Sequence, residues 1–251
     1  MRMPGGQAFH APPLTPLNRA LIIAIIGLFV LDSMTKMASG VSLASIFGLF
    51  PGRFLEGHIY QLITYPFFNT HLLGVIFNCL LLWFLGTDVE HRLGQKRYIM
   101  LMLVSIIGAG IVYIFMASFL FKSFLFIPLM GMSGAIFSLV LVYGINNPDT
   151  YFSFMFLFPI KARYVLCFYV MMELYSAIFS PMGKAAWAHL GAMAFGFMYL
   201  KMPDLDLFSK LFKKNGRKPG GGKKKRRDGP GLYIVKDGEG EADKKDPRYW
   251  Q

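Results

Sequence analysis

The sequence predicts an all-α polytopic membrane protein, and three observations lead to that prediction. Apolar residues make up 55% of the 251-residue chain, charged residues only 16%, and the mean hydropathy is +0.46. The apolar residues gather in nearly uncharged runs, such as 20–31, 72–85 and 99–121. With their flanks these runs approach the roughly 20 residues that cross a bilayer, and they lack the alternation of barrel strands.

Six spans are expected, with a long semi-apolar connection between the first two, 38–69, lying in the outer interface. The expected spans are 18–37, 70–86, 98–119, 132–145, 162–179 and 185–201. The last three are short, and the fourth begins at a glycine-bearing turn. Helices that begin inside the membrane need protein or a water-filled cavity to satisfy the backbone. The short spans therefore indicate a site partway down the membrane.

The basic loop residues predict the orientation. One side of the membrane has the larger set, Arg2, Arg19, Arg92, Lys96, Arg97, Lys161, Arg163 and the tail, and the other has only Lys36, Arg53, Lys122 and Lys184. Cytoplasmic loops are the ones enriched in Lys and Arg. We therefore expect both termini in the cytoplasm, as in a bacterial inner (plasma) membrane protein. This topological role also explains the net charge of +12, and no nucleic-acid partner is expected.

Composition divides the chain into three segments. Residues 1–17 form a cytoplasmic N-terminal segment, 18–202 the membrane domain and 203–251 a basic tail. The tail is rich in Gly, Lys and acidic residues and cannot bury a core, so we predict that it is disordered. Its basic run Lys223–Arg227 is expected to contact anionic lipid, although a purely solvated charge run is an equally simple interpretation.

Polar side chains within the expected spans are few. They are Asn78, Ser133, Glu173 and His189, with Asp32 and His71 near span ends. Because such residues are costly in the membrane, each is a functional hypothesis. Glu173 is expected to face water or to pair with a backbone group. No metal-binding cluster or nucleotide-binding loop is evident, so no metal or cofactor is expected.

Ser133 lies in Gly131-Met132-Ser133-Gly134, at the expected start of the fourth helix. A lone serine in a membrane helix usually bonds back to a carbonyl. Here the flanking glycines, Gly131 and Gly134, would let another backbone approach closely. The helix N-terminus would also place unpaired N–H groups beside the hydroxyl, where an oxyanion could be stabilised.

His189 lies on a stripe of small residues, because Ala185, His189, Ala192 and Gly196 follow helical spacing. Small residues at this spacing let two membrane helices come into backbone contact. If the neighbour is the fourth helix, a hydrogen bond between Ser133 and His189 becomes feasible, as nucleophile activation requires. The alternative is a histidine that only bonds across a helix pair.

These segments have a family resemblance. GMSGAIFSLV and AHLGAMAFG resemble the Gly-x-Ser-Gly and Ala-His-x-Gly segments of rhomboid intramembrane serine proteases. QLITYPFFNTHLLGVIFNCLLLWFLGTDVEHRLG is similar to the family's first-loop end, second helix and following turn, and FPIKARYV to the entry of its fifth helix. The resemblance covers about 18–200 and implies a six-transmembrane-helix rhomboid-like bundle.

The resemblance also implies roles for individual residues. Ser133 would be the nucleophile and His189 the general base, in a dyad without a carboxylate. Asn78 would donate to the oxyanion together with the Ser133 N–H, and Phe137 would pack on the imidazole. The histidine that many members carry four residues before the asparagine is Gly74 here.

Three functions remain open at this stage. The leading one is a protease that cuts transmembrane segments of membrane-protein substrates near their outer end. The second is a catalytically weak or inactive rhomboid-fold protein that binds membrane clients, which Gly74 favours. The third is a small transporter with Asn78, Glu173 and His189 as a relay, although the sequence shows no internal repeat of the kind many transporters have.

Overall fold

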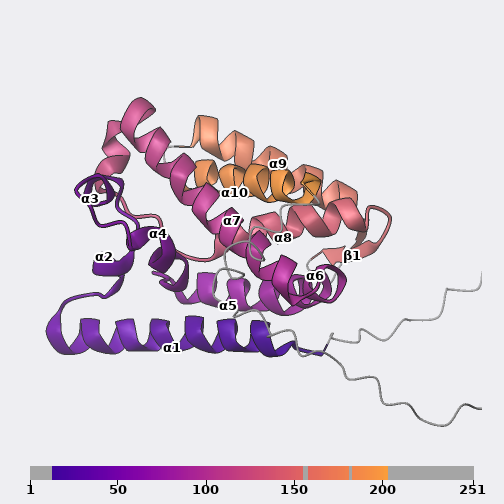
Figure 1. Cartoon of the computed structure of the whole chain (residues 1–251), viewed down its shortest axis with the longest axis horizontal. Helices are drawn as coiled ribbons and strands as arrows, with labels where there is room; N and C mark the ends of the chain where they lie inside the picture. The colour runs from indigo at the N-terminus through magenta and orange to yellow at the C-terminus, as the bar shows by residue number, and fades with distance from the viewer. Residues whose placement is uncertain (1–12, 155–157, 181–182, 203–251) are drawn as a thin grey trace, which may run out of the picture. The chain divides into compact units, whose positions relative to one another are not determined.

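The computed structural model describes residues 13–154, 158–180 and 183–202, all within the unit Met1–Phe208. The described part is mostly helical (Figure 1). Most of the predicted N-terminal segment and the whole predicted disordered tail, with Lys223–Arg227, lie outside the described residues.

Helices are present over all six predicted ranges. They are α1 Pro16–Ser39, α5 Leu72–Leu81 with η2 Leu82–Gly86 and α6 Thr87–Leu93, α7 Gln95–Phe115 with η3 Met116–Leu120, α8 Ser133–Asn146, α9 Ala162–Phe179 and α10 Lys184–Lys201. The second is longer than predicted, because it continues through the π-helical turn η2 to Leu93. It ends where Gly94 adopts a φ of +77°, which favours glycine.

Local sequence explains the ends of α1. Pro16 occupies the first helical position, and the Thr15 hydroxyl accepts a hydrogen bond from the Asn18 N–H. Gly40 ends the helix in the left-handed conformation, with its N–H donated to the Lys36 carbonyl at 3.0 Å. The Asn18 amide also donates to the buried Glu90 carboxylate at 2.9 Å, which ties α1 to α6.

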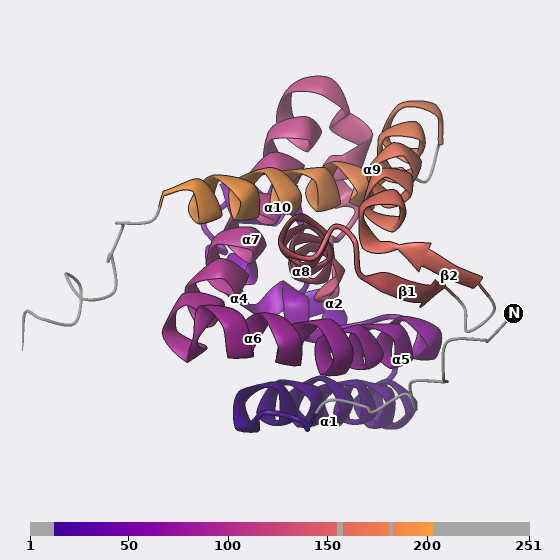
Figure 2. The ribbon, with the colours of Figure 1, turned by 90° about the vertical axis from the view of Figure 1, so that its right-hand side faces the viewer.

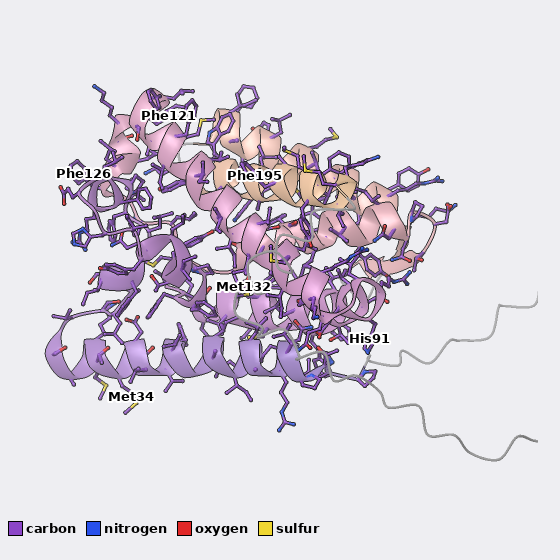
Figure 3. All side chains as sticks on the ribbon, in the orientation of Figure 1. Met34, His91, Phe121, Phe126, Met132 and Phe195 are labelled. Carbon is purple, nitrogen blue, oxygen red and sulfur yellow. The ribbon has the colours of Figure 1, made fainter. Side chains whose placement is uncertain are left out.

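The exposed helix surfaces are apolar. Among the described residues, four helices are long and apolar enough to cross a membrane: Pro16–Ser39, Leu72–Leu93, Gln95–Leu120 and Ala162–Phe179. On α1, Met34 points away from the other helices with 64% of its surface exposed (Figure 3), and Met171 on α9 is 70% exposed. Apolar surface on this scale is stable against lipid and not against water. The chain is therefore an integral membrane protein.

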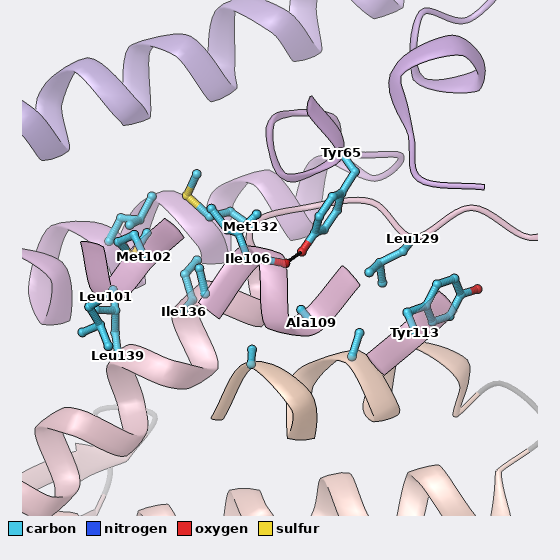
Figure 4. Close-up of a cluster of buried hydrophobic side chains, with 14 of the residues drawn as sticks. Tyr65, Leu101, Met102, Ile106, Ala109, Tyr113, Leu129, Met132, Ile136 and Leu139 are labelled. Atoms are coloured by element: carbon cyan, nitrogen blue, oxygen red, sulfur yellow. Dashed lines mark hydrogen bonds between the residues drawn. The ribbon is translucent and has the colours of Figure 1, made fainter. Parts of the chain in front are cut away.

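Helix α8 lies in the middle of the described helices. Figure 2 looks almost along it, and α5, α6, α7, α9 and α10 all contact it. Buried apolar side chains of α7 and α8 pack together beside the connection 38–69, called the first loop here (Figure 4). They include Leu101, Ile106, Ala109, Ile136 and Leu139. The Tyr65 hydroxyl donates to the Ile106 carbonyl at 2.8 Å, so the loop is tied to this core.

Small residues bring three helices into near-backbone contact. A Cβ added to Gly134 on α8 would lie 3.3 Å from the Ala109 Cβ on α7 and 3.6 Å from the Ala192 Cβ on α10. A Cβ on Gly196 would lie 1.9 Å from the Ser138 Oγ on α8. The predicted close contact between the fourth and sixth helices is confirmed.

The connection 38–69 is folded into short helices: α2 Ala44–Phe47, α3 Pro51–Leu55, α4 Gln61–Thr64 and η1 Tyr65–Phe67. The buried Gln61 amide holds it together by accepting from the Phe50 N–H and donating to the Ile46 carbonyl. Paired hydrogen bonds of 3.0 and 2.9 Å join Leu49 to Leu129, in the segment after η4 Lys122–Phe126. The loop formed by 38–69 is therefore hydrogen-bonded to the segment that leads into α8.

The connection between α8 and α9, for which no span was predicted, contains two short strands. Strands β1 Tyr151–Phe154 and β2 Phe158–Lys161 pair antiparallel, with Tyr151 opposite Lys161. An antiparallel pair satisfies backbone N–H and C=O groups of this connection. At its base Lys161 donates to the Asp149 carboxylate at 3.1 Å, which lowers the pKa of Asp149 below its ordinary value.

Candidate active site

A glycine turn positions Ser133 at the first residue of α8. Gly131 has a φ of +93°, a conformation that favours glycine, and its N–H donates to the Tyr65 carbonyl at 3.0 Å. A Cβ at this position would lie 2.9 Å from the Asn69 Oδ1. Because the first N–H groups of a helix have no intrahelical acceptor, the Ser133 hydroxyl stands beside free donors and the positive end of the helix dipole.

His189 on α10 lies opposite this serine. Its Nε2 is 2.9 Å from the Ser133 Oγ, and its side chain is 13% exposed. The two residues are 56 positions apart in sequence and meet only because α8 and α10 pack closely. An unprotonated Nε2 accepts the serine proton in this arrangement, as nucleophile activation requires.

Phe137 lies one helical turn after Ser133 and stacks on the imidazole. The two ring centroids are 4.5 Å apart with an interplanar angle of 24°. Phe137 also contacts Tyr169 on α9, with ring centroids 5.7 Å apart in an edge-to-face arrangement. The stack restrains the plane of the His189 ring.

The Glu173 carboxylate reaches the other side of the same imidazole. Its Oε2 lies 3.1 Å from the His189 Nδ1, and its side chain is 16% exposed. The sequence did not predict this contact: the partner of Glu173 is an imidazole, and a carboxylate does adjoin the histidine of the predicted dyad. The sequence did carry a signal, because Glu173 is the one acidic residue within the apolar run of α9.

Asn78 lies beside the turn that precedes Ser133. Its side chain is 7% exposed, and its Nδ2 is 3.7 Å from the position of a Cβ on Gly131. The Nδ2 donates to the Asn69 Oδ1 at 3.0 Å, which orients the Asn78 amide. Sequence reasoning did not single out Asn69, since nothing in its spacing predicted the pairing. Among the described side chains, the Asn69 Nδ2 is one of the buried polar atoms without a hydrogen-bond partner.

Gly74 stands where many family members carry a histidine, and the space beside it is unfilled. A Cβ on Gly74 would meet nothing within 4 Å. His71 is the residue before α5 and is exposed, so the structure does not bring it into the group around Ser133. The structure therefore collects Asn78, Ser133, Phe137 and His189 at one place and adds Asn69 and Glu173.

Comparison with known proteins supports the resemblance seen in the sequence. The family model of the rhomboid domain matches residues 56–202, which include every residue of this cluster. A search of curated protein sequences gives no match. Since the matched segment is more than half of the 251 residues, the chain belongs to the rhomboid family.

Proposed function

We propose that this protein is an intramembrane serine protease that hydrolyses peptide bonds in or near the transmembrane segments of membrane-protein substrates. One observation carries the proposal: in a membrane-embedded member of the rhomboid family, the Ser133 Oγ lies 2.9 Å from the His189 Nε2. A hydroxyl at a helix N-terminus beside an imidazole is a nucleophile with its general base.

The reaction follows from these two groups. The Ser133 Oγ attacks the carbonyl carbon of the scissile bond while its proton passes to the His189 Nε2. The tetrahedral intermediate collapses, the C–N bond breaks, and the leaving amine takes the proton from His189. Water then attacks the acyl-enzyme and gives its proton to His189, and the Ser133 oxygen leaves with that proton.

The oxyanion of the intermediate needs donors beside Ser133. The Ser133 N–H at the start of α8 is one, and the Asn78 amide, oriented by Asn69, is the other. Gly131 and Gly134 support this site because their missing side chains leave room for Asn69 and for helices α7 and α10. No cofactor is required for these steps.

The proposed topology has six spans in a bacterial inner membrane, with both termini in the cytoplasm and residues 18–202 as the membrane domain. Helix α8 then begins on the outer side, and its 14 residues are too few to cross the hydrocarbon core fully. We place the recessed end of this short helix at Ser133, below the outer surface, so that a substrate helix would be cut near its outer end.

The test is cleavage of a model transmembrane substrate by purified protein, together with fluorophosphonate labelling of Ser133. Ser133→Ala is expected to abolish both, and His189→Ala to abolish cleavage, because the pair acts as one unit. Ser138→Ala is the matched control, since it removes a buried hydroxyl from the same helix. Cleavage by Ser133→Ala would refute the assignment. A wild-type chain that binds clients without cutting them would instead support the inactive alternative.

A further inference from the structure

Glu173 is the acidic residue for which the dyad has no role. It lies in α9, whose remaining residues after Arg163 are uncharged, and most large side chains near it are apolar and exposed at the surface of the helices. An ionisable group at such a position is unfavourable unless a partner compensates it. Its partner is the His189 Nδ1, at 3.1 Å.

The hydrogen bonds of the imidazole then form a continuous series. The Ser133 Oγ lies 2.9 Å from Nε2 on one side, and the Glu173 Oε2 lies 3.1 Å from Nδ1 on the other. A carboxylate accepts a hydrogen bond from Nδ1–H and cannot donate one to it. It therefore favours the neutral tautomer whose Nε2 is free to accept the serine proton.

We propose that Glu173 is a positioning residue for His189, so that this chain has a Ser–His–carboxylate arrangement assembled from three helices. Phe137 restrains the plane of the ring by stacking, and Glu173 restrains its rotation within that plane. When Nε2 takes the serine proton, the imidazolium lies against a carboxylate, and their attraction is strong where little water enters. This inference rests on the proposed protease function.

The kinetic test compares three substitutions at this position. Glu173→Gln keeps the shape and removes the charge, and it is expected to lower kcat about 10- to 100-fold, the rate equivalent of one hydrogen bond to an ionised group. KM is expected to stay within about twofold, because the contact acts through His189 and not on the substrate. Glu173→Leu should lower kcat at least as much. Glu173→Asp keeps the charge and should retain more kcat than Glu173→Gln.

Met172→Gln is the matched control, since it places an amide at the neighbouring, half-exposed position of α9. It should retain wild-type kcat. Wild-type kcat in both Glu173→Gln and Glu173→Leu would overturn the proposal. A second pattern would also overturn it: kcat falls in parallel with the unfolding temperature across the variants, and Glu173→Asp retains no more kcat than Glu173→Gln. That pattern indicates a purely structural role.

A second readout does not depend on proteolysis. Nitrogen NMR of histidine-labelled protein reports which ring nitrogen carries the proton, and His189→Gln assigns the signal among the five histidines. We expect the neutral His189 ring to carry its proton on Nδ1 in the wild type and to move toward the Nε2–H form in Glu173→Leu. Unchanged nitrogen shifts would overturn the proposal even in a chain that proves inactive. Cleavage by Ser133→Ala would refute the assignment of Ser133 as the nucleophile and leave this measurement standing.

Discussion

Gly196 is the position where one added methyl group should push α10 away from α8. A Cβ there would lie 1.9 Å from the Ser138 Oγ, 3.1 Å from the Ser138 Cβ and 3.0 Å from the Ser105 Oγ. An ordinary van der Waals contact begins at 3.4 Å, so Gly196→Ala requires the Ser138 hydroxyl to rotate away and α10 to move by a few tenths of an ångström from the Ser138 Cβ and the Ser105 Oγ. Rotation of the Ser138 hydroxyl would relieve only part of the overlap, and it would break the 2.8 Å hydrogen bond from Ser105.

The consequence for the site follows from the helix geometry. His189 lies seven residues before Gly196, about 10 Å along the same helix. A displacement of α10 by a few tenths of an ångström away from α8 would lengthen the 2.9 Å hydrogen bond between the His189 Nε2 and the Ser133 Oγ. Overpacking of this kind costs about 1–3 kcal/mol of stability. A misplacement of roughly 1 Å can lower turnover about 100-fold, so the smaller displacement here should lower turnover by less than that.

The assay is thermal unfolding in detergent together with kcat on a transmembrane substrate. Gly196→Ala should lower both, and the larger Gly196→Val should lower them further. Adding Ser138→Ala to Gly196→Ala removes the clashing oxygen and should restore part of each. Gly27→Ala on α1 is the matched control, since its Cβ would meet nothing within 4 Å. Wild-type stability and turnover in Gly196→Ala would show that α8 and α10 do not make the contact on which the dyad depends.

Three further predictions concern the oxyanion donors and the tail. Asn78→Ala should lower kcat about 10²–10³-fold without abolishing it, since the Ser133 N–H remains; a kcat equal to that of the wild type would exclude the amide as a donor. Gly74→His should leave kcat unchanged or raise it, because the position is open and one turn from Asn78; a folded but inactive variant would mean that this chain builds its oxyanion site differently. Deleting 216–251 should leave the cleavage rate in detergent unchanged, whereas a tail peptide containing Lys223–Arg227 should bind anionic vesicles with up to about 1 kcal/mol per basic residue, weakened by salt. A large loss of cleavage on truncation would show that the tail belongs to the catalytic unit.

Local features of the chain predicted the helices, and the family resemblance singled out the two central site residues. The apolar runs lie where the helices lie, because the length of an apolar segment is a property of neighbouring residues alone. The stripe of small residues on the His189 helix, such as Ala192 and Gly196, is likewise visible at helical spacing in one segment. It predicted a close helix contact, although the spacing does not specify which helix is the partner.

Only the tertiary structure decided which polar groups meet. Glu173 and His189 lie on different helices, and their contact depends on how α9 and α10 are rotated about their axes, which no periodicity in either segment specifies. The pairing of Asn69 with Asn78 and the burial of Gln61 in the first loop depend likewise on how distant segments pack. The length of an apolar segment is set by neighbouring residues alone. A hydrogen bond between two helices, in contrast, requires a particular rotation of each helix and a particular distance between them. The carboxylate beside the histidine could therefore be found only once the helices were in place.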